Sequence, residues 1–477
     1  MDIVKRSPVV WAACGTVFGY YGGFWNIWNI WFFVAAGVVF LCFVRAAVYL
    51  TKERFWRSFA RLLSALLVGA VIGIYAHVNA QKPLQFGVET QRIKGILGIV
   101  RDDPRFFGSG GGIGRIAMHK VLSNGGVYTS ARGTVTVFFP KESLQRLREF
   151  GRKATVFVEG TYETSREAPV FSVRSVHIYR AAPPFEQWRT AIRSRIINRF
   201  AHSAYGGLSL ALILGFKDTL NPSLARYYQD AGCSHVLALS GMHVAIIAAV
   251  LAYILKKPLG LNLSSLVCAL CILGYTVLVG AQPSLVRATS MYLIGTFAVL
   301  GALPKKPLLI LSLSFIIQII VQPESGLSVA FMLSYLAIAG ILFLSPSIYA
   351  LIRGYIPDIA AQPLAASLSA FIATSATVNA VFGILRPFGI LSGLIIVPIT
   401  TVFMLLSFLF LAVPVAPVGY MLNGLYTVIS QLSFISSHIP GISVPEPLVR
   451  VLVPTVILIL ISVETWITRQ RTYCRPF

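Results

Sequence analysis

Residues 234–255 read SHVLALSGMHVAIIAAVLAYIL, a stretch in which a polar beginning passes directly into an apolar run. An apolar run of this length, followed by Lys256 and Lys257, is typical of a helix that crosses a membrane. The beginning of the stretch nevertheless carries two histidines, two serines and a glycine. Polar groups are costly inside a bilayer, so this end of the helix needs a reason in packing or in function.

The composition of the whole chain predicts a membrane protein. Of the 477 residues, 56% are hydrophobic and 12% are charged, which excludes an ordinary soluble protein. The formal net charge is +23. Part of this excess should orient the helices, because Lys and Arg collect in cytoplasmic loops. The remainder predicts attraction to anionic lipid or to another polyanion.

Apolar runs recur along the chain and predict a polytopic α-helical membrane protein with about ten to twelve transmembrane helices. The runs lie at about 9–24, 28–50, 58–78, 234–255, 262–281, 284–302, 307–322, 326–344, 363–384, 389–413, 417–438 and 448–466. A shorter apolar piece at 208–216 is too brief to span, and we expect it to be re-entrant or interfacial.

The basic residues give these helices a direction. If all twelve runs span, every positive cluster between them falls on one side of the membrane, together with both termini. The clusters are Lys5–Arg6, Arg45–Arg61, Lys256–Lys257, Lys305–Lys306, Arg353 and Arg469–Arg475. The pattern predicts a multi-pass protein of the plasma (inner) membrane with both termini cytoplasmic. The run at 417–438 contains polar residues. If it does not span, the basic cluster at the C-terminus would fall on the opposite side of the membrane.

Residues 81–182 differ in kind from the rest. β-branched segments with a period of two alternate with Gly, Asn and Pro, which predicts a small soluble β-domain of about five strands, with a short helical piece near 142–150. A small OB-like barrel fits this pattern, and the topology places it outside the cytoplasm. Lys and Arg exceed Asp and Glu here, which favours a polyanion. Candidate contacts to such a polyanion are Arg92, Lys94, Arg132, Arg152, Lys153 and Arg174.

Aromatic residues of the same domain could stack on flat groups of such a ligand, although the barrel core is the more frequent place for any one of them. They include Phe106, Phe107, Tyr128, Phe138, Phe157 and Phe171.

The sequence offers little for metal or cofactor chemistry. The seven histidines never form a closely spaced ligand pair, so we expect no metal site and no cofactor. None of the six cysteines lies in 81–182, so we expect no disulfide framework there.

The polar start of the quoted stretch has three readings. On one helix, His235 and His243 would share a face, Ser240 and His243 would be close enough to interact, and Gly241 would permit close helix approach. The cluster could fix the helix bundle, line a pathway or ligand site, or supply Ser240 as the nucleophile of an intramembrane hydrolase. The G-x-S-x-G elbow is absent, which weakens the last reading.

Two further polar patches begin spans that enter from the same outer side. Residues 280–288 read GAQPSLVRA and place Arg287 about one turn inside a helix, where it could snorkel outward or face a water-filled cavity ready for phosphates. Residues 331–337 read FMLSYLA and include Ser334. Three polar-marked segments in the outer half of one bundle favour a shared cavity.

These three segments, in this order and spacing, resemble the signature motifs of ComEC-type competence proteins. Residues 231–244 resemble the family's motif with two histidines and Ser-Gly, 280–288 its Pro-Ser and Arg-Ala motif, and 331–337 its Phe and Leu-Ser motif. The basic β-domain is similar to the family's OB-like insert. The resemblance implies a channel that imports single-stranded DNA across the cytoplasmic membrane during natural transformation, and not an enzyme. The implied path residues are His235, Ser240, Gly241, His243, Arg287 and Ser334.

The resemblance also sets the expected organisation. We expect N-terminal transmembrane helices in 1–80, the OB-like domain in 81–182, an amphipathic or re-entrant linker in 183–232, the competence-type channel domain in 233–466 and a basic tail in 467–477. Many members carry a metallo-β-lactamase-like nuclease domain, whose HxHxDH motif does not occur in these 477 residues. A separate nuclease, an ATP-driven translocase and a second copy of the chain are therefore expected partners, besides single-stranded DNA and anionic lipid. A transporter of a smaller anionic or lipid substrate stays an alternative.

Overall fold

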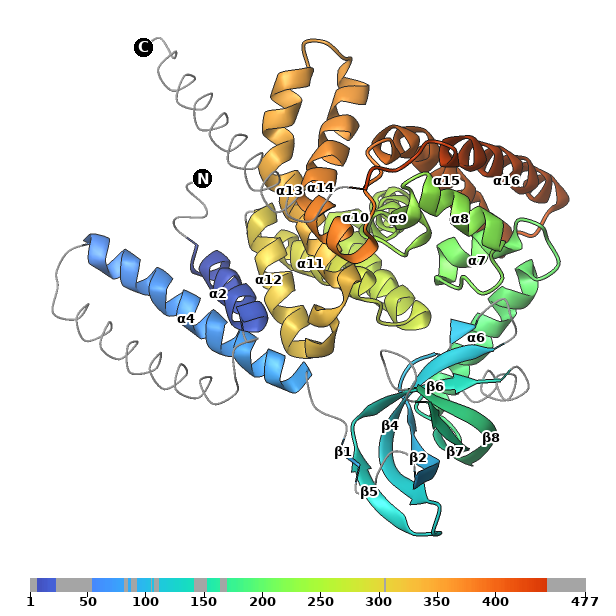
Figure 1. Ribbon diagram of the computed structural model, residues 1–477. Helices are drawn as coiled ribbons and strands as arrows, with labels where there is room; N and C mark the ends of the chain where they lie inside the picture. Colours follow the sequence, from blue (N-terminus) through green and yellow to red (C-terminus); the bar gives the residue numbers. More distant parts are fainter. Residues whose placement is uncertain are drawn as a thin grey trace.

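The computed structural model describes residues 7–22, 54–80, 85–86, 92–103, 105–106, 111–140, 152–163, 170–303 and 306–443. A bundle of helices carries a small β-barrel at one end (Figure 1). The spans expected at 28–50 and 448–466, the helical piece near 142–150 and the tail at 467–477 lie outside the described residues.

The helices follow the apolar runs closely. They are α2 (Pro8–Gly22), α4 (Arg54–Ala80), α6 (Pro184–Phe200), α7 (Gly206–Leu214), α8 (Pro222–Asp230), α9 (Ser234–Leu237), α10 (Gly241–Val279), α11 (Pro283–Leu300), α12 (Pro307–Val321), the 3₁₀ turn η2 (Pro323–Leu327), α13 (Val329–Ile352), α14 (Asp358–Phe382), α15 (Gly389–Ala412) and α16 (Ala416–Ser437).

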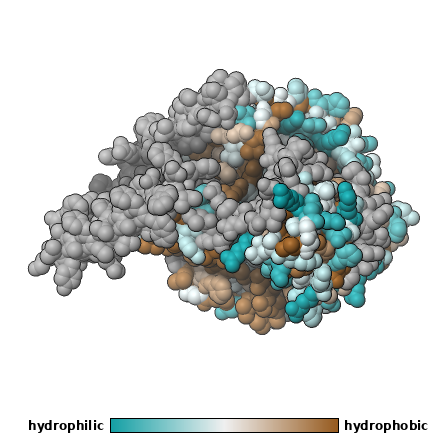
Figure 2. Space-filling view, turned by 60° about the horizontal axis from the view of Figure 1, so that its bottom comes forward, coloured by the Kyte–Doolittle hydropathy of each residue, from teal (hydrophilic) through white to brown (hydrophobic). Residues whose placement is uncertain are grey.

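Five of the described helices are long and apolar enough to cross a membrane, namely α10, α11, α13, α14 and α15. Shorter apolar segments lie in α2, α4 and α12. The helix α16, which covers the weakest predicted span, does not meet the same criterion. Large apolar side chains are exposed on the outside of the bundle, as expected for lipid-facing helices. In Figure 2, hydrophobic brown areas lie beside hydrophilic teal ones on the face that carries the barrel.

Helix α10 contains two of the predicted spans. Its two halves meet at Gly260, whose φ of 71° and ψ of 177° interrupt the helix just after Lys256 and Lys257. Only a residue without a Cβ adopts this conformation readily. The predicted beginning of the first half is wrong, because the chain leaves the helix after Leu237 and α10 begins at Gly241.

The β-domain is a closed barrel, which confirms the OB-like prediction. Its five barrel strands are β2 (Ile93–Val100), β4 (Gly112–Ser123), β6 (Thr134–Phe139), β7 (Thr155–Glu163) and β8 (Val170–Arg180). They pair in the order β4-β2-β7-β8-β6, and β6 returns to β4, so the sheet closes. The β6–β8 pair is parallel and the others are antiparallel. The short strands β1 (Gln85–Phe86), β3 (Arg105–Phe106) and β5 (Tyr128–Arg132) extend this sheet.

The alternation of side chains decides which aromatic residues fill the barrel. Val156 and Val158 point into its core, and Phe171 joins them with no exposed surface. Phe157 lies between the two valines and therefore points to the outer face, where its ring covers Gly95. A Cβ at Gly95 would lie 2.6 Å from this ring, so the glycine makes room for it.

Helix α7 lies in the interior of the bundle. Every residue from Leu208 to Leu214 is at most 2% exposed. The Oγ atoms of Ser209 and of Ser407 in α15 are 3.0 Å apart, and the Tyr275 hydroxyl of α10 donates to the carbonyl of Ile213 at 2.7 Å. The short apolar piece is therefore enclosed by protein and serves as the core around which α6, α10 and α15 pack.

Helices α2 and α4 pack backbone against backbone. A Cβ at Gly15 would lie 1.8 Å from the carbonyl oxygen of Leu66, and a Cβ at Gly69 would lie 1.8 Å from that of Ala12. Each helix carries two glycines four residues apart, at Gly15 and Gly19 and at Gly69 and Gly73. Small residues at this spacing let membrane helices approach until their backbones touch.

We predict that Gly69→Ala separates α2 from α4, because the added Cβ collides with the carbonyl of Ala12. Overpacking of this kind costs about 1–3 kcal/mol. The thermal unfolding midpoint of the detergent-solubilised protein should therefore fall. Gly274→Ala in α10 is the matched control, since a Cβ there meets nothing within 4 Å. Equal midpoints for both variants would contradict the close packing.

Candidate functional site

The polar start of the quoted stretch forms a helix cap. Ser240 is extended, with φ of −122° and ψ of 172°, and precedes the first turn of α10. The backbone N–H of Ser240 donates to Nδ1 of His243 at 3.2 Å, and the Ser240 Oγ lies 3.1 Å from the same nitrogen. Because a backbone N–H can only donate, Nδ1 accepts, and the His243 proton sits on Nε2. The pair is thus a capping box in which histidine takes the usual place of glutamate.

This cap separates the two histidines of the motif. His235 lies in the short helix α9 and is exposed, whereas His243 lies in α10 and is 1% exposed. The expected shared helical face of His235 and His243 is therefore wrong, because Ala238 adopts extended backbone between them. The interaction expected between Ser240 and His243 is present.

The second motif packs directly on this break. The Ser284 hydroxyl, in the first turn of α11, donates to the carbonyl of Leu239 at 2.6 Å. One turn later, Arg287 reaches Gly241, where a Cβ would lie 3.3 Å from its Nη2 atom. The structure thus brings the first two motifs together, and Gly241 provides the space for the guanidinium group.

The third motif reaches the same place through Tyr335. The guanidinium carbon of Arg287 lies 5.7 Å from the centre of the Tyr335 ring, a cation–π distance. The predicted Ser334 is half-buried one position earlier. Sequence reasoning selected the serine because it is polar and missed the tyrosine, although both belong to the same quoted motif.

Gln318 of α12 links these elements and was not predicted. Its Nε2 donates to the carbonyl of Pro283 at 3.0 Å, and its Oε1 accepts from the Tyr335 hydroxyl at 3.0 Å. The Tyr335 hydroxyl is also 3.3 Å from the Oγ of Ser314. A glutamine in the middle of an apolar run is the signal that could have identified it, because a buried amide must find partners.

Arg287 is buried without a complete set of partners. It is 5% exposed, and within the described parts of the chain its Nε and Nη1 atoms have no hydrogen-bond acceptor. A buried cation is costly unless an anion or several acceptors compensate it. The planar guanidinium group fits two oxygens of a phosphate or carboxylate, so the arrangement can receive an anion.

The outer face of the barrel presents a row of cross-strand partners. Going from β5 to β8, the row consists of Ser130, Lys120, Leu97, Phe157 and His177. The rings of Tyr128 and Tyr179 flank Phe157, with centroids 6.4 and 6.3 Å away. Tyr128 is 51% exposed and Tyr179 is 69% exposed. Exposed aromatic rings beside a lysine form a surface on which flat, negatively charged ligands can stack.

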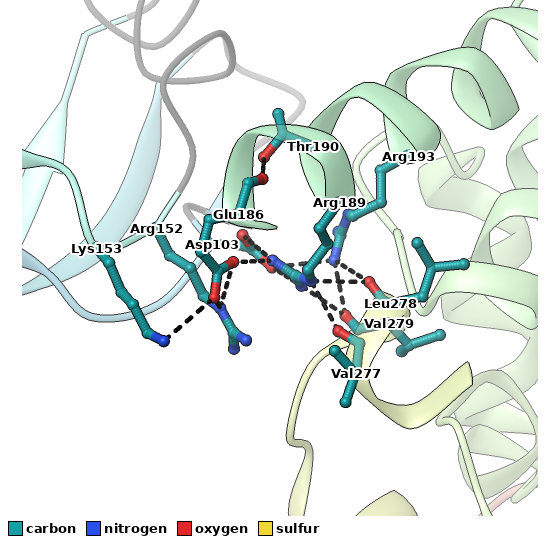
Figure 3. A network of polar contacts seen from close by, with 10 residues as sticks. All are labelled: Asp103, Arg152, Lys153, Glu186, Arg189, Thr190, Arg193, Val277, Leu278 and Val279. Carbon is teal, nitrogen blue, oxygen red and sulfur yellow. Dashed lines mark hydrogen bonds and ion pairs between the residues drawn. The ribbon is translucent and has the colours of Figure 1, made fainter. Parts of the chain in front are cut away.

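The predicted basic contacts of the barrel divide into two groups. Four are exposed on the barrel, namely Arg92, Lys94, Arg132 and Arg174. The other two lie where the barrel meets α6. There Arg152 Nε donates to both carboxylate oxygens of Glu186 at 2.9 Å, and Lys153 Nζ lies 3.6 Å from the same carboxylate (Figure 3).

Comparison with known proteins supports the motif reading. A family model described as "Competence protein" matches residues 212–469, which is more than half of the chain and includes all three motifs. The chain is also 29% identical over 207 residues to "ComE operon protein 3" of Bacillus subtilis (strain 168). That match covers 42% of this chain and 26% of the relative, so the chain spans about a quarter of the relative's length. No solved structure matches.

We predict that Gln318→Leu destabilises the site, because it removes one bond to the carbonyl of Pro283 and one to the hydroxyl of Tyr335. A buried polar group that loses its partner costs about 1–3 kcal/mol. The thermal midpoint of the solubilised protein should fall. Gln229→Leu, on the exposed side of α8, should leave it nearly unchanged. A Gln318→Leu midpoint equal to that of Gln229→Leu would contradict the assigned role.

Proposed function

The chain belongs to the competence protein family, and we propose that its membrane domain conducts single-stranded DNA across the cytoplasmic membrane during natural transformation. The observation that carries this proposal is Arg287, a buried cation with unused donors at the meeting point of all three motifs. A passing phosphodiester would supply the missing acceptors. Because such a contact is made anew with each phosphate, it lowers the barrier to entry without holding the strand.

The neighbouring motif residues would frame the path around this cation. Ser240 and His243 fix the start of α10, and Gly241 leaves room for the guanidinium group. His235 is exposed and Ser334 half-buried, so either could contact a strand in passing. In this proposal their roles are polarity and close packing, and no bond in the DNA is broken by them.

The barrel would collect the strand outside the membrane. Its exposed basic residues attract a polyanion, and the rings of Tyr128, Phe157 and Tyr179 offer stacking surfaces for bases. Arg152 and Lys153 lie at the junction between the barrel and α6, together with Arg189 and Arg193. The carboxylates of Glu186 and Asp103 pair with these four residues, so the junction serves first as the contact between the barrel and the helices.

The contacts of the barrel support the proposed topology. Arg101 pairs with Glu324 of η2 at 2.9 Å, so the barrel lies at the α12–α13 connection. It also contacts the C-terminal end of α10, at the opposite end of that helix segment from Lys256, Lys257 and the kink at Gly260. If the lysines are cytoplasmic, the barrel is extracytoplasmic, and the number of predicted spans would place both termini in the cytoplasm. A separate nuclease, an ATP-driven translocase and self-association complete the proposal. The translocase would supply the driving force, which the family match does not name.

One distance favours a second candidate function. Ser240 Oγ lies 3.1 Å from Nδ1 of His243, the separation of a nucleophile and its base in serine hydrolases. In this chain, however, Nδ1 also accepts the backbone N–H of Ser240, as a capping group does. We therefore rank an intramembrane serine hydrolase below the channel. Transport of a smaller anion or a lipid would use the same Arg287.

We predict that Arg287→Ala lowers uptake of labelled DNA roughly tenfold to hundredfold, because a hydrogen bond to a charged group contributes about 1.5–3 kcal/mol. Membrane abundance, measured by immunoblot, should stay normal. Arg287→Lys keeps the charge and should retain part of the uptake. Arg353→Ala, at the exposed end of α13, is the matched control.

Three results, from this experiment and from two further ones, decide between the candidates. A loss of abundance in Arg287→Ala would show that the arginine is structural and would overturn its role in the path. Labelling of Ser240 by a fluorophosphonate, together with loss of hydrolytic activity in Ser240→Ala, would favour the hydrolase. Normal DNA uptake without the chain, combined with altered uptake of a small anion, would favour the smaller cargo.

We predict that the double variant Tyr128→Ala/Tyr179→Ala weakens binding of single-stranded DNA by the solubilised full chain tenfold or more. Base–aromatic stacking contributes about 1–3 kcal/mol per base, and both rings are exposed on the barrel. The slope of log affinity against log salt should stay the same, because no charge is removed. Tyr355→Ala removes a 90% exposed ring at the end of α13 and serves as the control. Unchanged affinity in the double variant would exclude this face.

A further inference from the structure

Arg189 is the most completely enclosed charge in the described chain. It belongs to α6 and has no exposed surface, although α6 is a polar and basic helix. Its Nε donates to the carbonyls of Val277 at 2.8 Å and Leu278 at 3.1 Å, and its Nη2 donates to that of Val279 at 3.3 Å. These are the last three carbonyls of α10, which lack partners within the helix. The negative end of the helix dipole also favours a cation there.

Asp103 of the barrel completes the same cluster. It lies in the connection between β2 and β3, and both of its carboxylate oxygens accept from Arg189, at 3.1 and 2.5 Å. Arg193 donates to Asp103 at 2.9 Å and to the carbonyl of Val279 at 2.7 Å (Figure 3). Burial alone would raise the pKa of Asp103, but the bonds and charges of Arg189 and Arg193 hold that pKa below its usual range. The carboxylate is thus charged and shared between two arginines that cap α10.

The cluster meets the second motif at Gly280. This glycine has φ of 113°, a conformation that side chains rarely adopt, and a Cβ there would lie 3.3 Å from Nη2 of Arg189. Three residues later α11 begins at Pro283, and its first turns carry Ser284 and Arg287. The position of the turn between α10 and α11 is therefore set on one side by Arg189 and on the other by the bond from Ser284 to Leu239.

We propose that Asp103 is a positioning residue for the membrane site. Through Arg189 and Arg193, the barrel holds the α10–α11 turn and with it the start of the helix that carries Arg287. The barrel is then a part of the machinery that shapes the site, besides being a surface that collects a ligand. The effect on transport rests on the proposed function, whereas the effect on geometry does not.

The chain contains a matched control at the preceding position. Asp102 is also a carboxylate, but its partner is Arg115 of β4, which lies 4.0 Å from Glu324 of η2 and not at the cluster of α6 and α10. Asp102→Asn and Asp103→Asn therefore make the same chemical change on adjacent residues, and only the second breaks the contact to Arg189. Asp103→Glu keeps the carboxylate and tests whether the charge restores the contact.

Two measurements on the full chain in lipid nanodiscs and in cells test the proposal. Spin labels at Ser130 in the barrel and Ala281 in the turn, both exposed, report the distance between them in a background without native cysteines. We expect Asp103→Asn to broaden the distance distribution and lower DNA uptake at least tenfold, at normal membrane abundance. Asp102→Asn should leave the distance distribution unchanged and DNA uptake within twofold of that of the parent chain. Asp103→Glu should recover most of the uptake.

The outcomes separate this inference from the proposed function. An unchanged distance distribution in Asp103→Asn overturns the positioning role, whatever happens to uptake. Equal broadening in Asp102→Asn also overturns it, because the effect would then be one of charge alone. If uptake proves independent of the chain while the distances respond to Asp103→Asn alone, the positioning role stands and the proposed cargo is wrong.

Discussion

A fully buried guanidinium group, that of Arg189, binds at once the barrel's Asp103 and the last carbonyls of α10. Removing a charge from water is unfavourable unless hydrogen bonds compensate it, and here every side of the group meets an acceptor. The soluble and membrane parts of the chain are joined by this contact and by the pair between Arg101 and Glu324. The rest of the architecture depends on it, because it fixes where α10 ends and where the next helix begins.

Arg287 is under the same constraint, but hydrogen bonds compensate its buried charge less completely. It is almost as buried, yet two of its donors have no acceptor within the described part of the chain. The tyrosine ring beside it compensates only part of the cost. This difference between the two arginines supports the proposed contact between Arg287 and an anion. A phosphate backbone meets that need repeatedly along its length, which is why the proposed cargo is a nucleic acid.

Sequence patterns predicted much of the fold and less of the site. The apolar runs predicted the long helices that the structure describes, and the alternation in 81–182 predicted the barrel. Both patterns are local consequences of burial. The predicted helix through His235 was wrong, since Ser240 caps a new helix and the chain is extended before it. The structure brings Ser240 to His243 and Gly241 to Arg287, and the path that the motifs predicted there stays a prediction.

By itself, then, the sequence determined the membrane class, the inserted barrel and the identity of three polar segments, because composition and periodicity follow from burial alone. Only the tertiary structure decided which side chains meet. It joined Arg287 to Tyr335 and Tyr335 to Gln318, and it turned Arg152 and Lys153 towards Glu186 at the junction with α6. These contacts are made between residues far apart in the chain. Their geometry depends on how whole helices and the barrel pack, which no short stretch encodes.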